Sequence, residues 1–173
     1  LRIQAPGIAG QLGVGASIAV NGACLTALAP DQDGFSADVS SETLARTTLG
    51  QLAAGSQVNL EPPVTPATPL DGHIVSGHVD AVGHVRQLEA VGEALCVWFD
   101  LTPALMRMVA EKGSITVEGV SLTVNAVDAT GFAVMLIPHT QAVTTWNEVA
   151  MGAKVNLEVD TMARYVARLR EWA

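Results

Sequence analysis

The sequence predicts an all-β fold in which one small domain occurs twice and a helix follows the second copy. Three observations predict it. A long segment recurs at a fixed offset, short alternating runs of residues are separated by glycine turns, and the last residues repeat apolar side chains at helical spacing. Each copy is therefore expected to be a small β-barrel or sandwich.

The repeat aligns at an offset of 97 residues. At this offset residues 22–26 align with residues 119–123, and residues 58–61 with residues 155–158. Over residues 17–61, 20 of 45 positions are identical, far more than chance gives at one offset. The second copy opens near Gly77, so the matching start of the first copy would lie about 20 residues before Leu1. We therefore expect the first strand of the first copy to be missing from this sequence.

The local signals place the β-elements. Residues 1–4 read as the middle of a strand. Residues 19–24 and 116–121 each place a two-residue turn, Asn-Gly or Glu-Gly, between alternating runs. A tight hairpin turn of type I′ needs positive φ at both central residues, which Asn-Gly supplies most readily. These turns predict one hairpin per copy.

The remaining segments read as linker and helix. Residues 62–69 are too rich in proline for a helix or a central strand and form the linker. Residues 43–49 and 140–146 are expected to be short helical or irregular excursions. The tail carries Met162, Val166 and Leu169 on one helical face, and Asp160 stands where an N-cap belongs. The predicted boundaries are residues 1–73 and 74–160 for the two domains and 161–173 for the helix.

The composition is that of a folded, acidic protein. Hydrophobic residues make up 49% of the 173 residues, which provides ample apolar surface for a core. A net charge of −8 argues against nucleic acid or an anionic membrane as the main partner, because both attract basic surfaces. The apolar runs fall short of the ~20 residues that a membrane span needs, and no signal peptide is recognised, so we expect a cytoplasmic protein. Two cysteines, Cys24 and Cys96, indicate no disulfide framework.

Each copy presents two small polar side chains after its glycine turn. Cys24 and Thr26 share one strand face, as do Ser121 and Thr123, because side chains alternate with period two. The pairs indicate either two related binding pockets or simply a lining of small residues in which Cys24 is a buried hydrophobe.

Two other sets of residues could carry chemistry, a histidine metal site and a hydrolase triad, but the sequence supports both less well. The strand parity and spacing of His73, His78 and His84 do not suit a shared metal, so we expect no metal site. Ser121, His139 and Asp160 could form a hydrolase triad, but Ser121 lacks the Gly-x-Ser-x-Gly turn. No phosphate-binding glycine loop and no dinucleotide fingerprint occurs.

Several segments resemble the riboflavin synthase family when they are taken in order and within the repeat. They are GASIAVNGACLT at residues 15–26, DVSSETL at 38–44, GHIVSGHVD at 72–80, KGSI at 112–115, VSLTV at 120–124, LIPHT at 136–140 and VNLEVD at 155–160. The resemblance covers essentially the whole chain.

The resemblance implies two tandem six-stranded Greek-key β-barrels related by pseudo-two-fold symmetry, plus a C-terminal helix that supports a homotrimer. It implies a transferase that converts two molecules of 6,7-dimethyl-8-ribityllumazine into riboflavin and 5-amino-6-(D-ribitylamino)uracil, the last step of riboflavin biosynthesis. The family uses no metal or organic cofactor. The active site would lie between the N-terminal barrel of one subunit and the C-terminal barrel of its neighbour, and lumazine synthase would be an associated protein.

The same resemblance assigns site residues. The catalytic candidates are Cys24, His78, Ser121, Thr123 and Asp160. The substrate-binding candidates of the N-terminal barrel are Cys24, Leu25, Thr26, Asp38, Val39, Ser40, Ser41, Glu42 and Thr43. Those of the C-terminal barrel are Gly77, His78, Val79, Lys112, Ser121, Leu122, Thr123, Leu136, Ile137, Pro138, His139, Thr140 and Gln141.

Two other functions stay open at this point. A non-catalytic lumazine- or flavin-binding protein of the same fold would bind the same ring system without turnover. A purely structural β-barrel interaction module would need no polar pocket. The polar pairs after both glycine turns favour the enzyme over either alternative.

Overall fold

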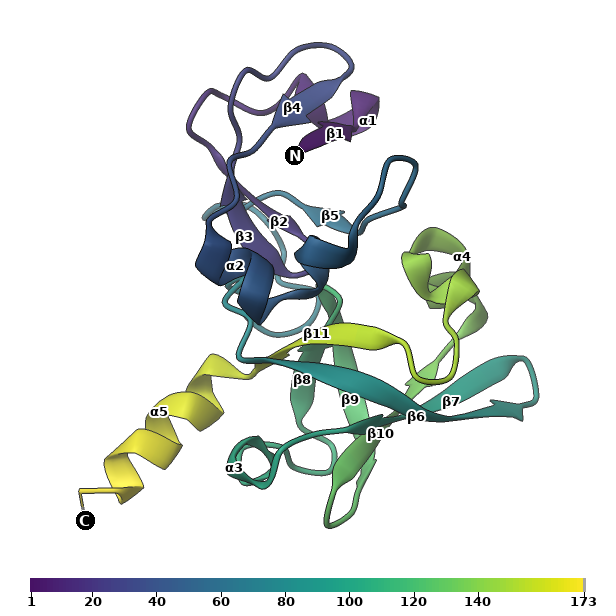
Figure 1. The fold of residues 1–173 in the computed structure, drawn as a ribbon. Coiled ribbons are helices and arrows are strands. Elements are labelled where there is room, and N and C mark those ends of the chain that lie inside the picture. The colour runs from purple at the N-terminus through teal and green to yellow at the C-terminus, as the bar shows by residue number, and fades with distance from the viewer. Residues whose placement is uncertain (173) are drawn as a thin grey trace.

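The computed structural model describes residues 1–172, and its C-terminal half is a closed barrel of six antiparallel strands (Figure 1). The strands neighbour one another in the order β10-β7-β6-β11-β8-β9, and β9 pairs with β10 to close the barrel. Their bounds are β6 Ala81–Val91, β7 Ala94–Asp100, β8 Ser114–Val117, β9 Val120–Val127, β10 Gly131–Leu136 and β11 Lys154–Val159. Closure leaves no free sheet edge in this half, and it confirms the barrel predicted for the second copy.

Aromatic rings fill the core of this barrel. Phe99 and Phe132 are fully buried and stack with their ring centroids 5.2 Å apart. Trp146 lies edge-on to Phe99 at 5.8 Å. Each such side chain stabilises the fold by about 1.5–3 kcal/mol through removal of its apolar surface from water. The strands that carry candidate residues are thus fixed on a packed core.

The N-terminal half repeats five of these six strands and is not closed. Its strands are β1 Arg2–Gln4, β2 Ser17–Val20, β3 Ala23–Thr26, β4 Gly34–Ser36 and β5 Leu60–Glu61. They form two sheets, β1-β4 and β3-β2-β5. In the C-terminal half β6 joins β7 to β11, whereas no strand within residues 1–172 takes the matching place between β1 and β5. A second closed barrel therefore stays a prediction.

The helices repeat at the same offset as the sequence. The short helices are α1 Pro6–Ala9, α2 Ser41–Arg46, η1 Thr48–Gln51, α3 Pro103–Met106, α4 Pro138–Val143 and η2 Thr145–Glu148. Each of the first three recurs 97 residues later as α3, α4 and η2 respectively. The excursions expected after each hairpin are therefore confirmed as pairs of short helices.

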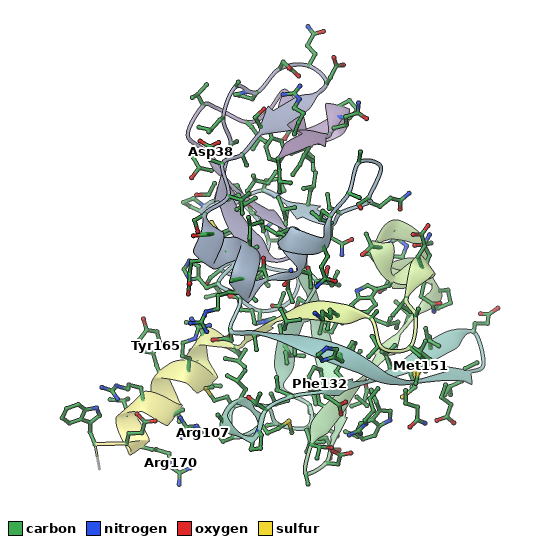
Figure 2. The ribbon with its side chains drawn as sticks, in the orientation of Figure 1. Asp38, Arg107, Phe132, Met151, Tyr165 and Arg170 are labelled. Carbon is green, nitrogen blue, oxygen red and sulfur yellow. The ribbon has the colours of Figure 1, made fainter. Side chains whose placement is uncertain are left out.

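The last helix, α5 Thr161–Arg170, projects away from the barrel (Figures 1 and 2). It begins as predicted, with the Asp160 carboxylate accepting a hydrogen bond from the Met162 amide at 2.9 Å. Its apolar face is uncovered, since Met162 and Leu169 are 72% and 71% exposed. None of the helices described is long and apolar enough to cross a bilayer.

Candidate functional site

The two halves of the chain, residues 1–61 and 76–160, meet at their tight turns. Asn21, Gly22, Glu118 and Gly119 have φ values of 47°, 75°, 51° and 81°, which confirms the predicted type I′ geometry. A Cβ on Gly22 would lie 2.8 Å from the Gly119 nitrogen, and one on Gly119 would lie 2.7 Å from the Gly22 nitrogen. Only glycine fits this contact. Its reciprocity is what a two-fold axis between the turns produces.

Asn59 bonds across this junction. Its side-chain nitrogen donates to the Glu118 carbonyl at 2.8 Å, and its side-chain oxygen accepts from the Thr145 amide at 3.0 Å. The backbone N–H of Asn59 in turn donates to the side-chain oxygen of Asn21 at 2.7 Å. One asparagine thus ties its own turn to the opposite half.

Asn156 is the counterpart of Asn59 in the second half, 97 residues later, and makes the equivalent contacts in the opposite direction across the junction. Its side-chain nitrogen donates to the Asn21 carbonyl at 2.8 Å, and its oxygen accepts from the Thr48 amide at 2.7 Å. The backbone N–H of Asn156 donates to the Glu118 carboxylate, which also accepts from the Thr48 hydroxyl at 3.3 Å. The junction is therefore a reciprocal hydrogen-bond network rather than a loose contact.

Glu118 is the unusual member of this network. It stands where the first half has the neutral Asn21, and it is only 9% exposed. Burial raises the pKa of the Glu118 carboxyl from 4.5 to about 7, although the hydrogen bonds from Asn156 and Thr48 oppose the shift. The junction thus holds a carboxyl group that titrates near neutrality.

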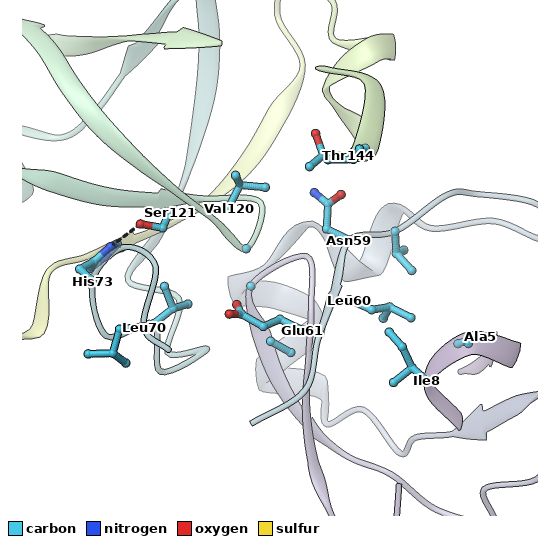
Figure 3. Close-up of a pocket in the computed structure, with 17 residues that line it drawn as sticks. Ala5, Ile8, Asn59, Leu60, Glu61, Leu70, His73, Val120, Ser121 and Thr144 are labelled. Carbon is cyan, nitrogen blue, oxygen red and sulfur yellow. Dashed lines mark hydrogen bonds between the residues drawn. The ribbon is translucent and has the colours of Figure 1, made fainter. Parts of the chain in front are cut away.

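A cavity of about 570 Å³ opens beside the junction and is lined by both halves (Figure 3). Its polar side chains are Asn59, Glu61, His73, Ser121 and Thr144. Figure 3 shows His73 and Ser121 at one end, and the apolar residues Ala5 and Ile8 at the other. The volume and the mixed lining are those of a small-molecule site.

His73 and Ser121 form a hydrogen-bonded pair in this cavity. The His73 Nδ1 lies 2.8 Å from the Ser121 hydroxyl, and its Nε2 lies 3.1 Å from the hydroxyl of the buried Thr116. Burial lowers the pKa of His73, while the negative charges of Asp160 and Glu158 oppose that shift. A neutral imidazole can accept a hydrogen bond from one hydroxyl while its ring N–H donates a hydrogen bond to the other. The pair has the elements of a mild base.

A second cavity, of about 350 Å³, brings together three predicted site residues. Cys24, Gly77 and His78 line it, and Glu61 lies on its wall as well as on that of the first cavity. The Cys24 amide donates to the Gly77 carbonyl at 2.8 Å, so strand β3 of the first half contacts the start of the second. Burial, reinforced by the charge of Glu158, raises the pKa of Glu61.

The structure places the other catalytic candidates apart from these three. Ser121 lies in the first cavity, and Thr123 is exposed further along β9. Asp160 caps α5, and its charge reaches His73. Within one chain the five candidates thus form no single cluster: two share the second cavity, one lines the first, and Thr123 and Asp160 line neither.

The remaining substrate-binding candidates lie on surfaces outside both cavities or in the cores. Leu25, Leu122 and Leu136 are buried in the cores of their halves. Thr26 is exposed at the end of β3, and Val79 packs against the N-terminal core. The others lie in two regions that correspond in the repeat, and Lys112 precedes β8. The first region is α2 and the residues before it, with Asp38, Val39, Ser40, Ser41, Glu42 and Thr43. The second is α4 and the residue before it, with Ile137, Pro138, His139, Thr140 and Gln141. Their role in binding stays a prediction.

Sequence reasoning missed His73, Asn59, Asn156 and Glu158. His73 was considered only as a metal ligand on a continuous strand, but residues 71–80 are not a strand and β6 begins at Ala81. The identity of residues 58–61 and 155–158 was a usable signal for the asparagines and the glutamate. Within residues 1–172 no group of three His, Cys, Asp or Glu side chains is placed to hold a metal ion.

Comparison with known proteins places both halves in one domain family. The lumazine binding domain matches residues 1–62 and again residues 76–160. The riboflavin synthase of Mycobacterium tuberculosis (strain ATCC 25618 / H37Rv) is 47% identical over 173 residues, which cover 98% of this chain and 86% of that protein. The riboflavin synthase of Photobacterium phosphoreum is 46% identical over 156 residues, which cover 90% of this chain and 72% of that protein.

Solved structures share the fold. A crystal structure of LumP complexed with 6,7-dimethyl-8-(1'-D-ribityl) lumazine superposes with a TM-score of 0.80 at 22% identity, covering 91% of this chain and 85% of that one. A LumP complex with riboflavin also reaches a TM-score of 0.80, with 88% and 82% covered. At this identity the likeness describes the fold alone.

Proposed function

This chain belongs to the riboflavin synthase family, and from that premise we propose that it converts two molecules of 6,7-dimethyl-8-ribityllumazine into riboflavin and 5-amino-6-(D-ribitylamino)uracil. The observation that carries the proposal is the 47% identity to the Mycobacterium tuberculosis enzyme over 98% of the chain. Four carbons pass from one lumazine to the other, so the atoms balance without an oxidant, a reductant or a metal.

The chemistry asks little of the protein beyond positioning and a mild base. The C7 methyl of the lumazine is acidic because the ring delocalises the carbanion that forms. Holding two rings in register converts a bimolecular step into an intramolecular one, which removes much of the barrier. A general base then contributes about 10²–10⁴-fold. Two related pockets supply two related ring sites.

We assign roles on this basis. His78 transfers the proton, while Cys24 and Ser121 polarise the ring or position the nucleophile that adds to it, with Thr123 and Asp160 in support. The hydrogen bond between His73 and Ser121 supports this assignment, since a neutral imidazole orients the hydroxyl and can accept its proton. The contact of Cys24 with Gly77 supports placing His78 and Cys24 at one site.

The proposal extends to the assembly. The N-terminal half becomes a second six-stranded barrel, related to the first by the pseudo-two-fold axis, when a strand lies between β1 and β5. A groove lined by Leu1–Gln4 and the residues leading into β5 supports this place for it. The exposed apolar face of α5 supports a homotrimer in which the N-terminal barrel of one subunit meets the C-terminal barrel of the next. Association with lumazine synthase and a cytoplasmic location belong to the same proposal.

The test is turnover of the purified chain. Added 6,7-dimethyl-8-ribityllumazine should give riboflavin, followed by its absorbance and fluorescence. The variants Cys24→Ser and His78→Gln should each turn over at least about ten times more slowly, since each removes a group placed at the reacting rings. Cys96→Ser, on β7 outside both cavities, is the matched control and should behave as wild type.

The alternative is a protein that binds the lumazine or a flavin without converting it. LumP shares the fold, and its crystal structures contain the ribityl lumazine or riboflavin. The turnover assay therefore also has to test for binding without conversion. Tight binding of the lumazine with no riboflavin formed would favour it. Full turnover by both Cys24→Ser and His78→Gln would instead support the enzymatic function and contradict the roles assigned to these two side chains.

A further inference from the structure

We infer that Glu158 is a positioning residue of the proposed site. Its buried carboxylate fixes the backbone of Ser76, Gly77 and His78, and thereby the place of His78 beside Cys24. The inference rests on the proposed function, because the site that Glu158 serves is the one assigned there.

Three successive backbone amides converge on this carboxylate. Glu158 lies on β11 and is 2% exposed. Its Oε1 accepts from the Ser76 amide at 2.8 Å. Its Oε2 accepts from the Gly77 amide at 2.9 Å and from the His78 amide at 3.2 Å. Consecutive amides that point to one side form a cradle for an anion.

The cradle needs a carboxylate and not merely a polar side chain. A buried charge is tolerated only when it is paired or hydrogen-bonded. No lysine or arginine within residues 1–172 lies within ion-pair distance of Glu158, so these amides are what compensates its charge. A glutamine would turn an N–H group toward one or two of the amide donors. It would therefore lose hydrogen bonds and repel the loop.

The loop that Glu158 holds connects the two halves. Gly77 has a φ of 75°, and a Cβ there would lie 2.8 Å from the Cβ of Cys24. The Gly77 amide faces Glu158, while its carbonyl accepts the Cys24 amide. Displacement of the loop would therefore move His78 relative to Cys24.

Other contacts hold the chain on the far side of this loop. The Asp80 carboxylate accepts from the Val159 amide and from the Arg164 guanidinium, both at 2.9 Å. These bonds do not involve Glu158, so the start of β6 stays anchored without it. Loss of the Glu158 carboxylate should therefore release residues 76–78 while the barrel stays folded.

The experiment compares Glu158→Gln with Asp128→Asn. Asp128 also accepts two backbone amides, those of Thr130 and Gly131 at 2.8 Å, but in the β9–β10 turn away from both cavities. We expect Glu158→Gln to lower kcat at least tenfold with less than a threefold change in KM, and Asp128→Asn to leave kcat unchanged. In hydrogen exchange the amides of residues 76–78 should lose protection in Glu158→Gln alone.

A double variant separates positioning from a general loss of structure. If Glu158 acts through His78, Glu158→Gln added to His78→Gln should lower kcat less than twofold further. Multiplication of the two effects, or wild-type kcat in Glu158→Gln, would overturn the inference. Should Glu158→Gln fail to fold, Glu158→Asp takes its place: it keeps the charge with a shorter reach and should lose exchange protection at some of the three amides and part of kcat.

Failure of the proposed function would look different. A wild-type chain that makes no riboflavin would contradict that function, yet the exchange comparison would still test the loop. Unchanged protection of residues 76–78 in both Glu158 variants would overturn the positioning role whether or not the chain is an enzyme.

Discussion

Replacement of Glu118 by glutamine should remove a pH dependence of stability that originates at the junction. The carboxyl group is buried between the halves and its pKa is raised to about 7 from 4.5. A carboxyl whose pKa is higher in the folded state binds more protons when folded. Stability is then highest below the unfolded pKa and falls as pH rises through the window from 4.5 to about 7.

The magnitude follows from the width of that window. Each pKa unit corresponds to about 1.4 kcal/mol, so a rise of the pKa from 4.5 to about 7 amounts to about 3 kcal/mol at the alkaline end. Glutamine stays neutral, and its oxygen can still accept the Asn156 amide. Glu118→Gln should therefore match wild type near pH 4.5 and exceed it by about 3 kcal/mol at pH 8. For a chain of this length that is roughly 6–12 °C in Tm.

The assay is thermal unfolding of wild type and Glu118→Gln from pH 4.5 to 8.5 at constant ionic strength. Glu111→Gln, at an exposed position, serves as control and should follow the wild-type curve. The quantity of interest is the difference between the curves, because His73 and Glu61 titrate in all three proteins. A difference that does not grow with pH, or a variant less stable than wild type at pH 8, would refute the reasoning.

Three further outcomes follow from the structure. Gly22→Ala should destabilise the fold by at least about 2 kcal/mol more than Gly152→Ala in urea unfolding, since the φ values of 75° and 76° match but only Gly22 faces another backbone; equal losses would mean that the halves do not touch there. His73→Phe removes the partner of two hydroxyls and should cost about 1–3 kcal/mol by the same method, and a loss under about 0.5 kcal/mol would count against the hydrogen-bonded pair. Leu169→Lys should shift the proposed trimer toward monomer in sedimentation velocity, whereas Arg170→Ala should not; an unchanged trimer would place the interface elsewhere.

Local patterns in the sequence predicted the local structure well. The 97-residue offset matches α1, α2 and η1 to their second copies. Proline begins both α1 and α3, and a threonine side chain caps both η1 and η2, whereas α2 and α4 start on different residues. The Asn-Gly and Glu-Gly turns adopt positive φ, and Asp160 caps α5. These features depend on residues a few positions apart.

Contacts between distant segments could not be predicted in the same way. The pairing of His73 with Ser121 spans 48 residues and depends on how the linker returns to the junction. Strand parity gave no guide there, since the segment around His73 is not a strand. The approach of Gly22 to Gly119 likewise depends on how the halves dock. Periodicity describes one element at a time and contains no information on docking.

The product balance of the purified chain tests the central claim most directly. Incubated with 6,7-dimethyl-8-ribityllumazine and separated by liquid chromatography, the mixture should show two lumazine molecules consumed for each riboflavin, with an equal amount of 5-amino-6-(D-ribitylamino)uracil. That ratio is what four-carbon transfer between two identical substrates requires. Lumazine that is bound but recovered unchanged, or riboflavin without the pyrimidine product, would contradict the account.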